Sequence, residues 1–398
     1  MIHVCYTVTD LDGTYTKYAG ASLCSMFENT REWVTVHFLH NHTLSADNRR
    51  YLMQLVRSYG QQIVFIDIEK VYKERMRKLI ESIQWMKAHI HTPGVFFSEA
   101  IWYRLLIGDL LSDLDRVIYL DSDTIVNLDI GEFWREEGGA SGLAAVPDYV
   151  IQEKHLSDMV KLGLYPEDKY FNAGVLLIDI QKFRKVENLL ERGTAFLKEH
   201  DMVDYNDQDI LNYFYGREAR ILPDKYNAIV TYEMMNGREK IGNCIYHYAG
   251  QRYAIDTANN YHRLFLEYFT KTPWCNAEFL SNMAKNTHRH IRSQMLAYTN
   301  VIAGMNRIVI GSEGGKEKIT DLLSLKEHEA YYTLKEFNQR GLRLEPNEIL
   351  MFFLKPEEFE SVKKHLIACG CTENVHFIDG NIFLYRNAAQ DAKILRES

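Results

Sequence analysis

The stretch 116–126, RVIYLDSDTIV, joins an apolar run to two aspartates that stand one residue apart. The apolar residues 117–120 predict a buried strand, so Asp121 and Asp123 follow directly at its end. Ligands bind at the strand ends of open α/β sheets, and two carboxylates placed there by a bend can hold one divalent cation. Such a cation bridges diphosphate oxygens and neutralises a leaving group. The alternative is that the two aspartates only cap a turn.

Strands and helices alternate on both sides of this stretch, which is typical of an α/β domain. The strands are short and apolar, and the segments between them have apolar residues at helical spacing. Ser45 can cap a helix, and Gly60 can end it. The predicted strands are 3–9, 34–40, 63–68, 116–126, 142–148 and 171–180, and the predicted helices are 18–29, 45–59, 98–111 and 182–200.

The composition shifts near Thr272, which predicts a boundary between parts of the chain. The run 286–292, NTHRHIR, is basic and histidine-rich, so we expect a helical or irregular connector at 273–300. Beyond it, strands at 307–311 and 348–354, a helix at 356–370 and two apolar segments around a DGN turn resume the alternation. We therefore predict a first domain at 1–272, the connector at 273–300, and a small α/β domain of unknown function at 301–398.

The overall composition sets limits on location and partners. The 398 residues have a formal net charge of −8, which argues against nucleic acid as the main partner. No apolar run approaches the ~20 residues of a membrane-spanning helix, and the first residues lack the features of a signal peptide. We therefore expect a cytoplasmic protein whose six cysteines are reduced thiols. The connector could contact the inner face of the membrane, or it could be a solvated helical surface; the oligomeric state is not indicated.

The segment 171–180, FNAGVLLIDI, opens a predicted strand with polar and small residues. The amide of Asn172 can bond sugar hydroxyls, and the small Gly174 lets a bulky ligand approach the backbone closely. The alternative is a turn that only opens the strand.

The segment 204–212, DYNDQDILN, places Asp207, Gln208 and Asp209 at the start of an apolar helix. One acid at a helix start is usually a cap, but a cap does not need a glutamine between two acids.

The segment 245–250, IYHYAG, ends a predicted strand in His247, and Gly250 follows. A neutral imidazole there could be a third metal ligand beside the two aspartates. A histidine with a structural role is the alternative.

Four motifs follow one another along the chain: D-x-D, F-N-A-G-V, D-Q-D and H-Y-A-G. In this order they resemble glycosyltransferase family 8, which includes bacterial lipopolysaccharide galactosyl- and glucosyltransferases and glycogenin. The resemblance covers residues 1–270. It implies the GT-A fold of nucleotide-diphospho-sugar transferases and retention of the anomeric configuration. It also implies UDP-glucose or UDP-galactose as donor, a saccharide, lipid-linked or protein acceptor, and Mn²⁺ or Mg²⁺ as cofactor.

The resemblance assigns donor-binding roles to individual residues. Asp10 matches the acid that accepts the uracil N3–H, and Tyr15 matches the aromatic residue that stacks on the base, although the stretch between them is longer than in the family. Arg104 matches an arginine that contacts the donor, and Asp148, Asn172 and Asp207 match sugar-binding positions. Gly174 and Gly250, the glycines of two of the motifs, also belong to this predicted site.

The same resemblance assigns the metal and the chemistry. Asp121, Asp123 and His247 match the metal ligands, and Asp207 and Gln208 are the predicted catalytic residues, with Gln208 near the anomeric carbon. Because an amide is a poor nucleophile, we expect front-face attack by the acceptor hydroxyl, with the Gln208 carbonyl stabilising an oxocarbenium-like centre. A double displacement through Gln208 or Asp207 is the alternative.

One segment departs from the family pattern. The family has Lys-Pro-Trp after H-x-x-G, whereas this chain reads HYAGQRYAID at 247–256, with Tyr253 at the lysine position. Either Arg252 supplies the positive charge to the diphosphate, which an arginine can do bidentately, or diphosphate binding is weaker. A catalytically inactive protein that binds a sugar nucleotide or a glycan is therefore an alternative function.

A phosphohydrolase that forms an aspartyl-phosphate is a further alternative, because it also follows an apolar strand with D-x-D. Asp121 would be its nucleophile and Asp123 its acid/base. A G-D-x-x-x-D string exists at Gly108, Asp109 and Asp113, but it precedes the strand, whereas that superfamily places its second acidic motif well after the first.

Overall fold

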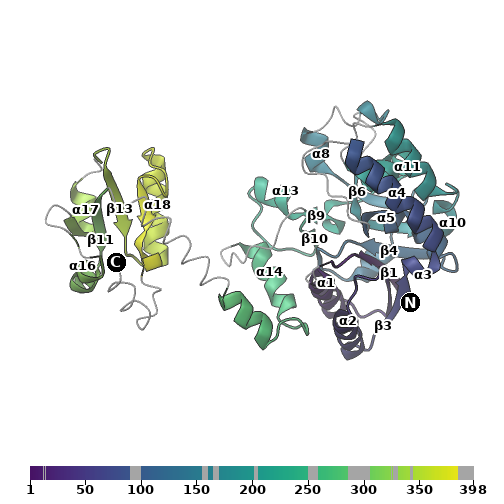
Figure 1. Ribbon diagram of the computed structural model, residues 1–398, viewed down its shortest axis with the longest axis horizontal. Coiled ribbons are helices and arrows are strands. Elements are labelled where there is room, and N and C mark those ends of the chain that lie inside the picture. The colour runs from purple at the N-terminus through teal and green to yellow at the C-terminus, as the bar shows by residue number, and fades with distance from the viewer. Residues whose placement is uncertain are drawn as a thin grey trace. The chain divides into compact units, whose positions relative to one another are not determined.

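The structure is a computed structural model of the chain, and the described residues form two compact units, Met1–Asn276 and Ala277–Ser398. Figure 1 shows the helices and strands of both units. The residues that the structure describes are 1–11, 13, 15–89, 100–154, 160–164, 170–200, 205–249, 259–285, 305–323, 325, 330–340 and 344–383.

The first unit is built on a seven-stranded sheet with the order β3-β2-β1-β4-β7-β6-β8. The strands from β3 to β4 are parallel, whereas β7 runs antiparallel to both β4 and β6. The strand order reverses between β1 and β4, which marks the crevice where open α/β sheets bind ligands. The strands are β1 Ile2–Val8, β2 Val34–His40, β3 Gln62–Asp67, β4 Arg116–Leu120, β6 Leu143–Pro147, β7 Phe171–Asp179 and β8 Arg220–Ile221.

Helices surround this sheet, and the inner strands β1, β4 and β7 are almost wholly buried (Figure 1). Two residues confirm the predicted limits of α2: Ser45 Oγ accepts from Asn48 N at 3.1 Å, and Gly60 follows with φ 67°. The helices are α1 Thr16–Asn29, α2 Ala46–Ser58, α3 Ile68–Val71, α4 Lys73–His89, α5 Ala100–Tyr103, α6 Ile107–Leu110, α7 Ile130–Trp134, α8 Tyr149–Lys154, α10 Ile180–Phe183, α11 Leu189–Glu199, α12 Asn206–Tyr215, α13 Val230–Met235 and α14 Asn260–Phe269; the 3₁₀ turns are η1 Arg104–Leu106, η2 Gly216–Glu218 and η3 Asp224–Tyr226.

A second sheet joins three short strands from distant parts of the sequence. It contains β5 Thr124–Val126, β9 Ala228–Ile229 and β10 Ile245–His247, with β10 antiparallel to β5 and parallel to β9. The prediction of one strand at 116–126 is therefore wrong. The chain bends at 121–123, because β4 belongs to the large sheet and β5 to the small one. This bend carries the D-x-D motif to the end of β10.

Two predicted helices are interrupted. The segment 182–200 contains the end of α10 and the whole of α11, and between them Asn188 has a left-handed backbone, with φ 53°, that a helix interior does not accept. The described part of 98–111 is a series of short turns, α5, η1 and α6. Apolar spacing predicts helical structure but does not distinguish a continuous α-helix from short α and 3₁₀ turns.

Trp274 closes the first unit, although the sequence assigns it to the connector 273–300. Its ring is buried, and its Nε1 donates to Asn48 Oδ1 at 2.8 Å. A Cβ atom on Gly20 of α1 would lie 2.3 Å from the ring, so the glycine makes room for the tryptophan. Residues 277–285 are helical, and the basic run 286–292 lies outside the described residues.

The second unit contains a parallel four-stranded sheet with the order β12-β11-β13-β14. Of the two apolar segments around the DGN turn, the first forms β14 and the second begins as a 3₁₀ turn. The strands are β11 Asn306–Gly311, β12 Ala330–Thr333, β13 Glu348–Phe352 and β14 Phe377–Asp379; the helices are α16 Lys316–Leu323, α17 Leu334–Arg340 and α18 Pro356–Ala368; the 3₁₀ turns are η4 Glu313–Gly315 and η5 Gly380–Phe383.

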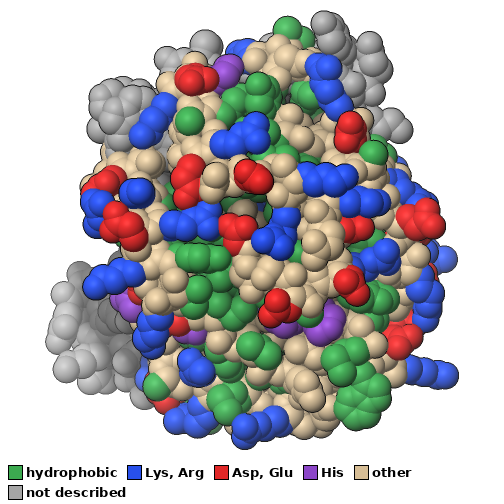
Figure 2. Space-filling view, turned by 90° about the vertical axis from the view of Figure 1, so that its right-hand side faces the viewer, with side chains coloured by type: hydrophobic (Ala, Val, Ile, Leu, Met, Phe, Trp, Pro, Cys, Tyr) green, Lys and Arg blue, Asp and Glu red, His purple; other side chains and the backbone are tan. Residues whose placement is uncertain are grey.

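The surface in Figure 2 carries Lys and Arg side chains interspersed with Asp and Glu. Ion pairs of this kind are exemplified by Arg75 of α4, which binds Asp109 of α6 at 2.7 Å and Glu191 of α11 at 2.8 Å. None of the helices in the described part of the chain combines the length and the apolar character needed to cross a membrane. All six cysteines, each within the described ranges, are free thiols.

Candidate active site

The D-x-D motif forms the bend between the two sheets of the first unit. Asp121 follows β4, and its backbone N–H donates to Gly174 O on β7 at 2.7 Å. Thr124, the first residue of β5, donates its hydroxyl to Asp121 O at 2.9 Å and closes the turn. Burial raises the pKa of the Asp121 carboxyl. For Asp123, burial acts in the same direction, but the nearby His247 outweighs it and lowers the pKa.

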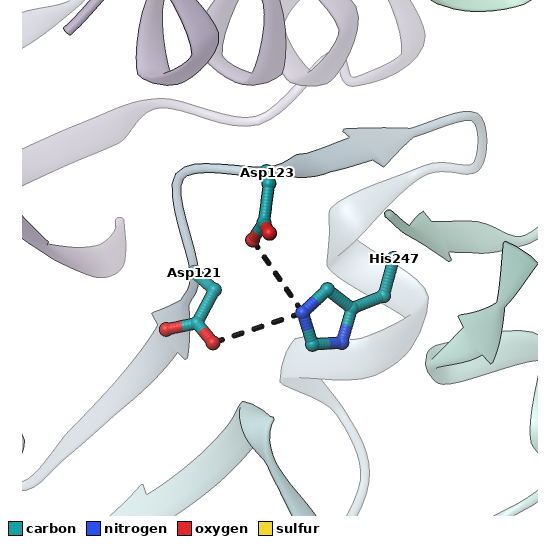
Figure 3. A group of neighbouring side chains, drawn as sticks. All are labelled: Asp121, Asp123 and His247. Carbon is teal, nitrogen blue, oxygen red and sulfur yellow. Dashed lines mark ion pairs between the residues drawn. The ribbon is translucent and has the colours of Figure 1, made fainter. Parts of the chain in front are cut away.

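His247 reaches this bend from a segment more than a hundred residues further along the chain. It is the last residue of β10, and the antiparallel register sets it opposite Thr124. Its Nε2 lies 3.7 Å from Asp121 Oδ2 and 3.5 Å from Asp123 Oδ1, as Figure 3 shows. One potential ligand atom from each of the three residues lies within 4.8 Å of the others. We call the side chains of Asp121, Asp123 and His247 the metal cluster. Two carboxylates and an imidazole suit a divalent cation such as Mn²⁺, so these residues could hold the predicted metal.

Gly174 leaves the space in which this cluster forms. A Cβ atom at this position would lie 2.2 Å from His247 Cε1 and 2.8 Å from Asp121 Oδ2. Any side chain would therefore displace two of the three ligands. The sequence predicts that this glycine leaves room for a ligand. In the structure, the side chains of His247 and Asp121 occupy the space beside it.

Arg104 links the D-x-D motif to the D-Q-D motif. Its buried guanidinium donates to Ala173 O at 2.6 Å and to Asp121 Oδ1 at 3.0 Å, and its Nε lies 2.8 Å from Asp207 Oδ2. The Tyr119 hydroxyl donates to the same Asp121 oxygen at 2.5 Å. Burial raises the pKa of Asp207 to about 7, although Arg104 acts in the opposite direction. Arg104 is therefore placed to orient two carboxylates, and Asp121 keeps Oδ2 directed towards His247.

Hydrogen bonds join Asp148 and Asn172, which are predicted to bind the sugar, to the predicted catalytic residue Gln208. Asp148 Oδ2 accepts from Asn172 Nδ2 at 3.0 Å and from Gln208 Nε2 at 3.1 Å. Gln208 Oε1 accepts from Ala173 N at 2.9 Å, which ties α12 to the start of β7. All three side chains are nearly buried. The structure thus brings the three residues together beside the metal cluster.

Asp209, the second acid of D-Q-D, makes structural hydrogen bonds at the start of α12. It accepts from the Tyr170 hydroxyl and from Tyr205 N at the start of α12. Of the three polar residues in this motif, Asp209 is therefore the one that secures the helix start.

Asp10 binds the protein itself. Its Oδ1 accepts from Tyr15 N at 2.6 Å, and its Oδ2 accepts from Asn48 Nδ2 at 2.8 Å and from the backbone N–H and hydroxyl of Thr16. The carboxylate thus secures the start of α1. Tyr15 stands at this helix start with 38% of its surface exposed. Burial of its hydroxyl and the charges of the two D-x-D aspartates raise its pKa.

Gly250 and Arg252 lie in 250–258, outside the described residues, as does Tyr253. Their predicted contacts with the donor stay predictions.

Asn227 is a member of the site that the sequence analysis does not predict. It lies just before β9, its Nδ2 donates to Asn172 Oδ1 at 2.9 Å, and its Oδ1 lies 3.1 Å from His247 Nδ1. Its sequence context indicates only a polar residue next to a short strand. The pairing of β9 with β10 brings it to His247, and that pairing has no local signal.

Comparison with known proteins identifies the fold and family. Residues 6–252 match the family model described as glycosyl transferase family 8, which is more than half of the chain. The chain belongs to glycosyltransferase family 8. Its metal cluster lies within the matched residues, as does every predicted site residue.

Relatives of this family extend over most of the chain. General stress protein A of Bacillus subtilis is 26% identical over 292 residues, covering 68% of this chain and 95% of that protein. The lipopolysaccharide 1,2-glucosyltransferase of Escherichia coli K12 is 26% identical over 331 residues, covering 76% of this chain and 89% of that protein.

The solved structure of galactosyltransferase LgtC, in complex with donor and acceptor sugar analogs, shares the fold with a TM-score of 0.57. It is 22% identical and covers 70% of this chain and 99% of that one. The first unit is therefore a GT-A fold, as the sequence predicts.

Family membership makes the chain a transferase and sets the phosphohydrolase alternative aside. The positions of the two acids in the G-D-x-x-x-D string also argue against a phosphohydrolase, because both are surface residues. Asp109 is paired with Arg75 and Asp113 is exposed, and neither belongs to the cluster at the bend.

Proposed function

We propose that the chain transfers a hexose from UDP-glucose or UDP-galactose to a saccharide or glycan acceptor, with retention of the anomeric configuration. Mn²⁺, or Mg²⁺ in its place, would be held by Asp121, Asp123 and His247. The observation that supports this most strongly is the convergence of these three ligand atoms at the bend between β4 and β5. When bound there, the ion would neutralise the charge that develops on the departing diphosphate.

The acceptor hydroxyl would attack the anomeric carbon on the face that the diphosphate leaves. The new glycosidic C–O bond forms as the bond to the diphosphate oxygen breaks, and the hydroxyl proton passes to that departing oxygen. No carboxylate of the chain needs to act as nucleophile, because the neutralised diphosphate is a good leaving group. Asp207, held against Arg104 Nε at 2.8 Å, would bind the sugar rather than attack it.

Gln208 would stabilise the positive charge that develops at the anomeric carbon. Its side-chain oxygen accepts from Ala173 N, and an amide oxygen has a second lone pair that can face a cationic centre. Asp148 and Asn172 would bind sugar hydroxyls from the same network, and Asp10 and Tyr15 would bind uracil at the start of α1. Double displacement through Gln208 or Asp207 predicts a covalent glycosyl-enzyme, which a slow fluorinated donor would trap.

The proposed location is the cytoplasm. The basic run 286–292 is either a solvated surface or a contact with the inner face of the membrane, where a lipid-linked acceptor would be presented. The basic composition of 286–292 supports the membrane contact, and so does the similarity of this chain to a lipopolysaccharide glucosyltransferase of Escherichia coli. Flotation with anionic vesicles tests it. Binding that is lost when Arg289 and Arg292 are replaced by glutamine supports the contact, and absence of binding excludes it.

The direct test of the reaction is release of UDP from a panel of UDP-sugars in the presence of Mn²⁺. Release with one sugar, lost in Asp123→Ala and unchanged in the matched control Asp113→Ala, supports the transferase and names its donor. Asp113 is an exposed aspartate outside the cluster. UDP binding without release from any sugar would contradict the proposal and favour the inactive sugar-nucleotide-binding protein.

A further inference from the structure

The side chain of Asn227 lies between a candidate metal ligand and the sugar-site network. It is 3% exposed, and it contacts His247 through Oδ1 and Asn172 through Nδ2. Its Oδ1 faces Nδ1 of the imidazole, whereas Asp121 and Asp123 face Nε2. Asn227 therefore lies at the ring nitrogen that does not face the metal cluster.

The orientation of the two asparagine amides follows from one backbone donor. Gly174 N–H donates to Asn172 at 2.9 Å, so the atom that it meets must be the Asn172 oxygen. This turns Asn172 Nδ2 towards Asp148, whose carboxylate accepts it at 3.0 Å. Asn227 contacts the same Asn172 oxygen at 2.9 Å and must therefore present its Nδ2 there. The Asn227 oxygen is thus left facing His247.

This orientation decides which ring nitrogen of His247 carries the proton. An amide oxygen only accepts, so Nδ1, 3.1 Å away, must be the donor. In the neutral ring the lone pair is then on Nε2, the atom that faces Asp121 and Asp123. Those two carboxylates by themselves favour a proton on Nε2, which would block metal binding.

We propose that Asn227, itself oriented by Asn172 and Gly174 N–H, is the positioning residue that sets the Nδ1–H tautomer of His247 and so directs its Nε2 lone pair to the metal. The inference rests on the proposed function for the identity of the metal site. It adds a buried residue that acts through its contact with His247. Hydrogen bonds of this kind fix ring orientation and raise the basicity of a metal-bound histidine.

The tautomer can be measured without any metal. In the wild-type chain labelled with ¹⁵N-histidine, the ring signals of His247 are assigned by their loss in His247→Gln. At alkaline pH, where the ring is neutral, we expect a protonated Nδ1 and an unprotonated Nε2. A proton on Nε2 in the wild-type chain overturns the inference, whatever happens to any variant.

Asn227→Leu removes the acceptor with little change in side-chain volume. We expect the proton to move towards Nε2, and we expect the affinity for Mn²⁺ alone, followed by the electron paramagnetic resonance signal of the free ion, to fall by about 10- to 100-fold. Asn212→Leu is the matched control. Asn212 is fully buried and also makes three hydrogen bonds, to Phe171 and Gln208, but it contacts no metal ligand.

The outcomes separate this inference from the proposed function. An equal loss of Mn²⁺ affinity in Asn212→Leu and Asn227→Leu, or an unchanged tautomer and affinity in a folded Asn227→Leu, contradicts the inference while UDP release still tests the function. If the wild-type chain shows the expected tautomer and Asn227→Leu the expected losses, but no UDP is released from any sugar, the inference stands and the proposed function fails.

Discussion

Asp10 and Asp123 follow neighbouring strands of one sheet, β1 and β4, yet the chain uses their carboxylates differently. Asp10 accepts hydrogen bonds from residues within six positions along the chain, and from Asn48 of α2. Asp123 faces His247, which is 124 residues away, since 247 − 123 = 124. We call the part of the crevice at Asp10 the base end and the part at Asp121, Asp123 and His247 the metal end, after the ligands proposed for them. The base end is held mainly by local bonds to a helix start, whereas the metal end depends on contacts between distant segments.

This difference indicates where each end is vulnerable. A local cap can be lost with a modest cost in stability, because the rest of the helix stays packed. A cluster of buried charges from distant segments needs every partner, since one unpaired charge in the interior is costly. Substitutions at the metal end should therefore have the larger effects.

The largest effect is expected for Arg104→Met. It leaves Asp121 and Asp207 without their shared partner at a site where the Arg104 side chain is only 7% exposed. We expect the free energy of unfolding to fall by about 3–5 kcal/mol, measured by urea denaturation. Arg75→Met is the matched control, because Arg75 also binds two carboxylates but at the surface, where each exposed pair contributes about 0–1 kcal/mol. If the free energy of unfolding falls equally in the two variants, Arg104 stabilises the protein no more than the surface residue Arg75 does.

Gly174→Ala should have an intermediate effect. The new methyl group would overlap His247 and Asp121, so we expect about 1–3 kcal/mol of destabilisation from overpacking, together with a fall of about 10-fold in Mn²⁺ affinity. Titration calorimetry with Mn²⁺ measures the affinity. The control is Gly314→Ala, where an added Cβ atom meets nothing within 4 Å. An unaltered Mn²⁺ affinity in Gly174→Ala would mean that the cluster does not need this space.

Asp10→Ala should have the smallest effect on the metal end. Loss of the bonds at the start of α1 should lower stability by about 1–2 kcal/mol, with Mn²⁺ affinity unchanged. Thermal unfolding and a Mn²⁺ titration on the same sample check both parts. A large loss of Mn²⁺ affinity would show that the base end and the metal end are coupled rather than independent.

The sequence predicts the individual residues of this site better than the strand pairing that brings them together. Asp121, Asp123 and His247 could be proposed as ligands because each follows or ends an apolar strand, and strand ends meet at a crevice. The division of 116–126 into two strands of different sheets, β4 and β5, is not predicted, because the residues on both sides of the motif are apolar enough to suggest one strand.

Other features had no local signal at all. Asn227 reaches His247 through the pairing of β9 with β10, and strands of two and three residues are too short to be predicted from the sequence. The role of Gly174 depends on the approach of a side chain from β10, which spacing along the chain does not show. The predicted helix at 182–200 is interrupted where Asn188 adopts a left-handed backbone, and apolar spacing gives no sign of it.

The central claim is that His247 coordinates a divalent metal together with the two aspartates of the D-x-D motif. It is tested most directly by pulsed electron paramagnetic resonance of the Mn²⁺-loaded chain, which detects nitrogen nuclei bound to the ion. We expect modulation from one imidazole nitrogen in the wild-type chain and its disappearance in His247→Gln. Bound Mn²⁺ with no nitrogen coupling, or coupling that persists in His247→Gln, would contradict it.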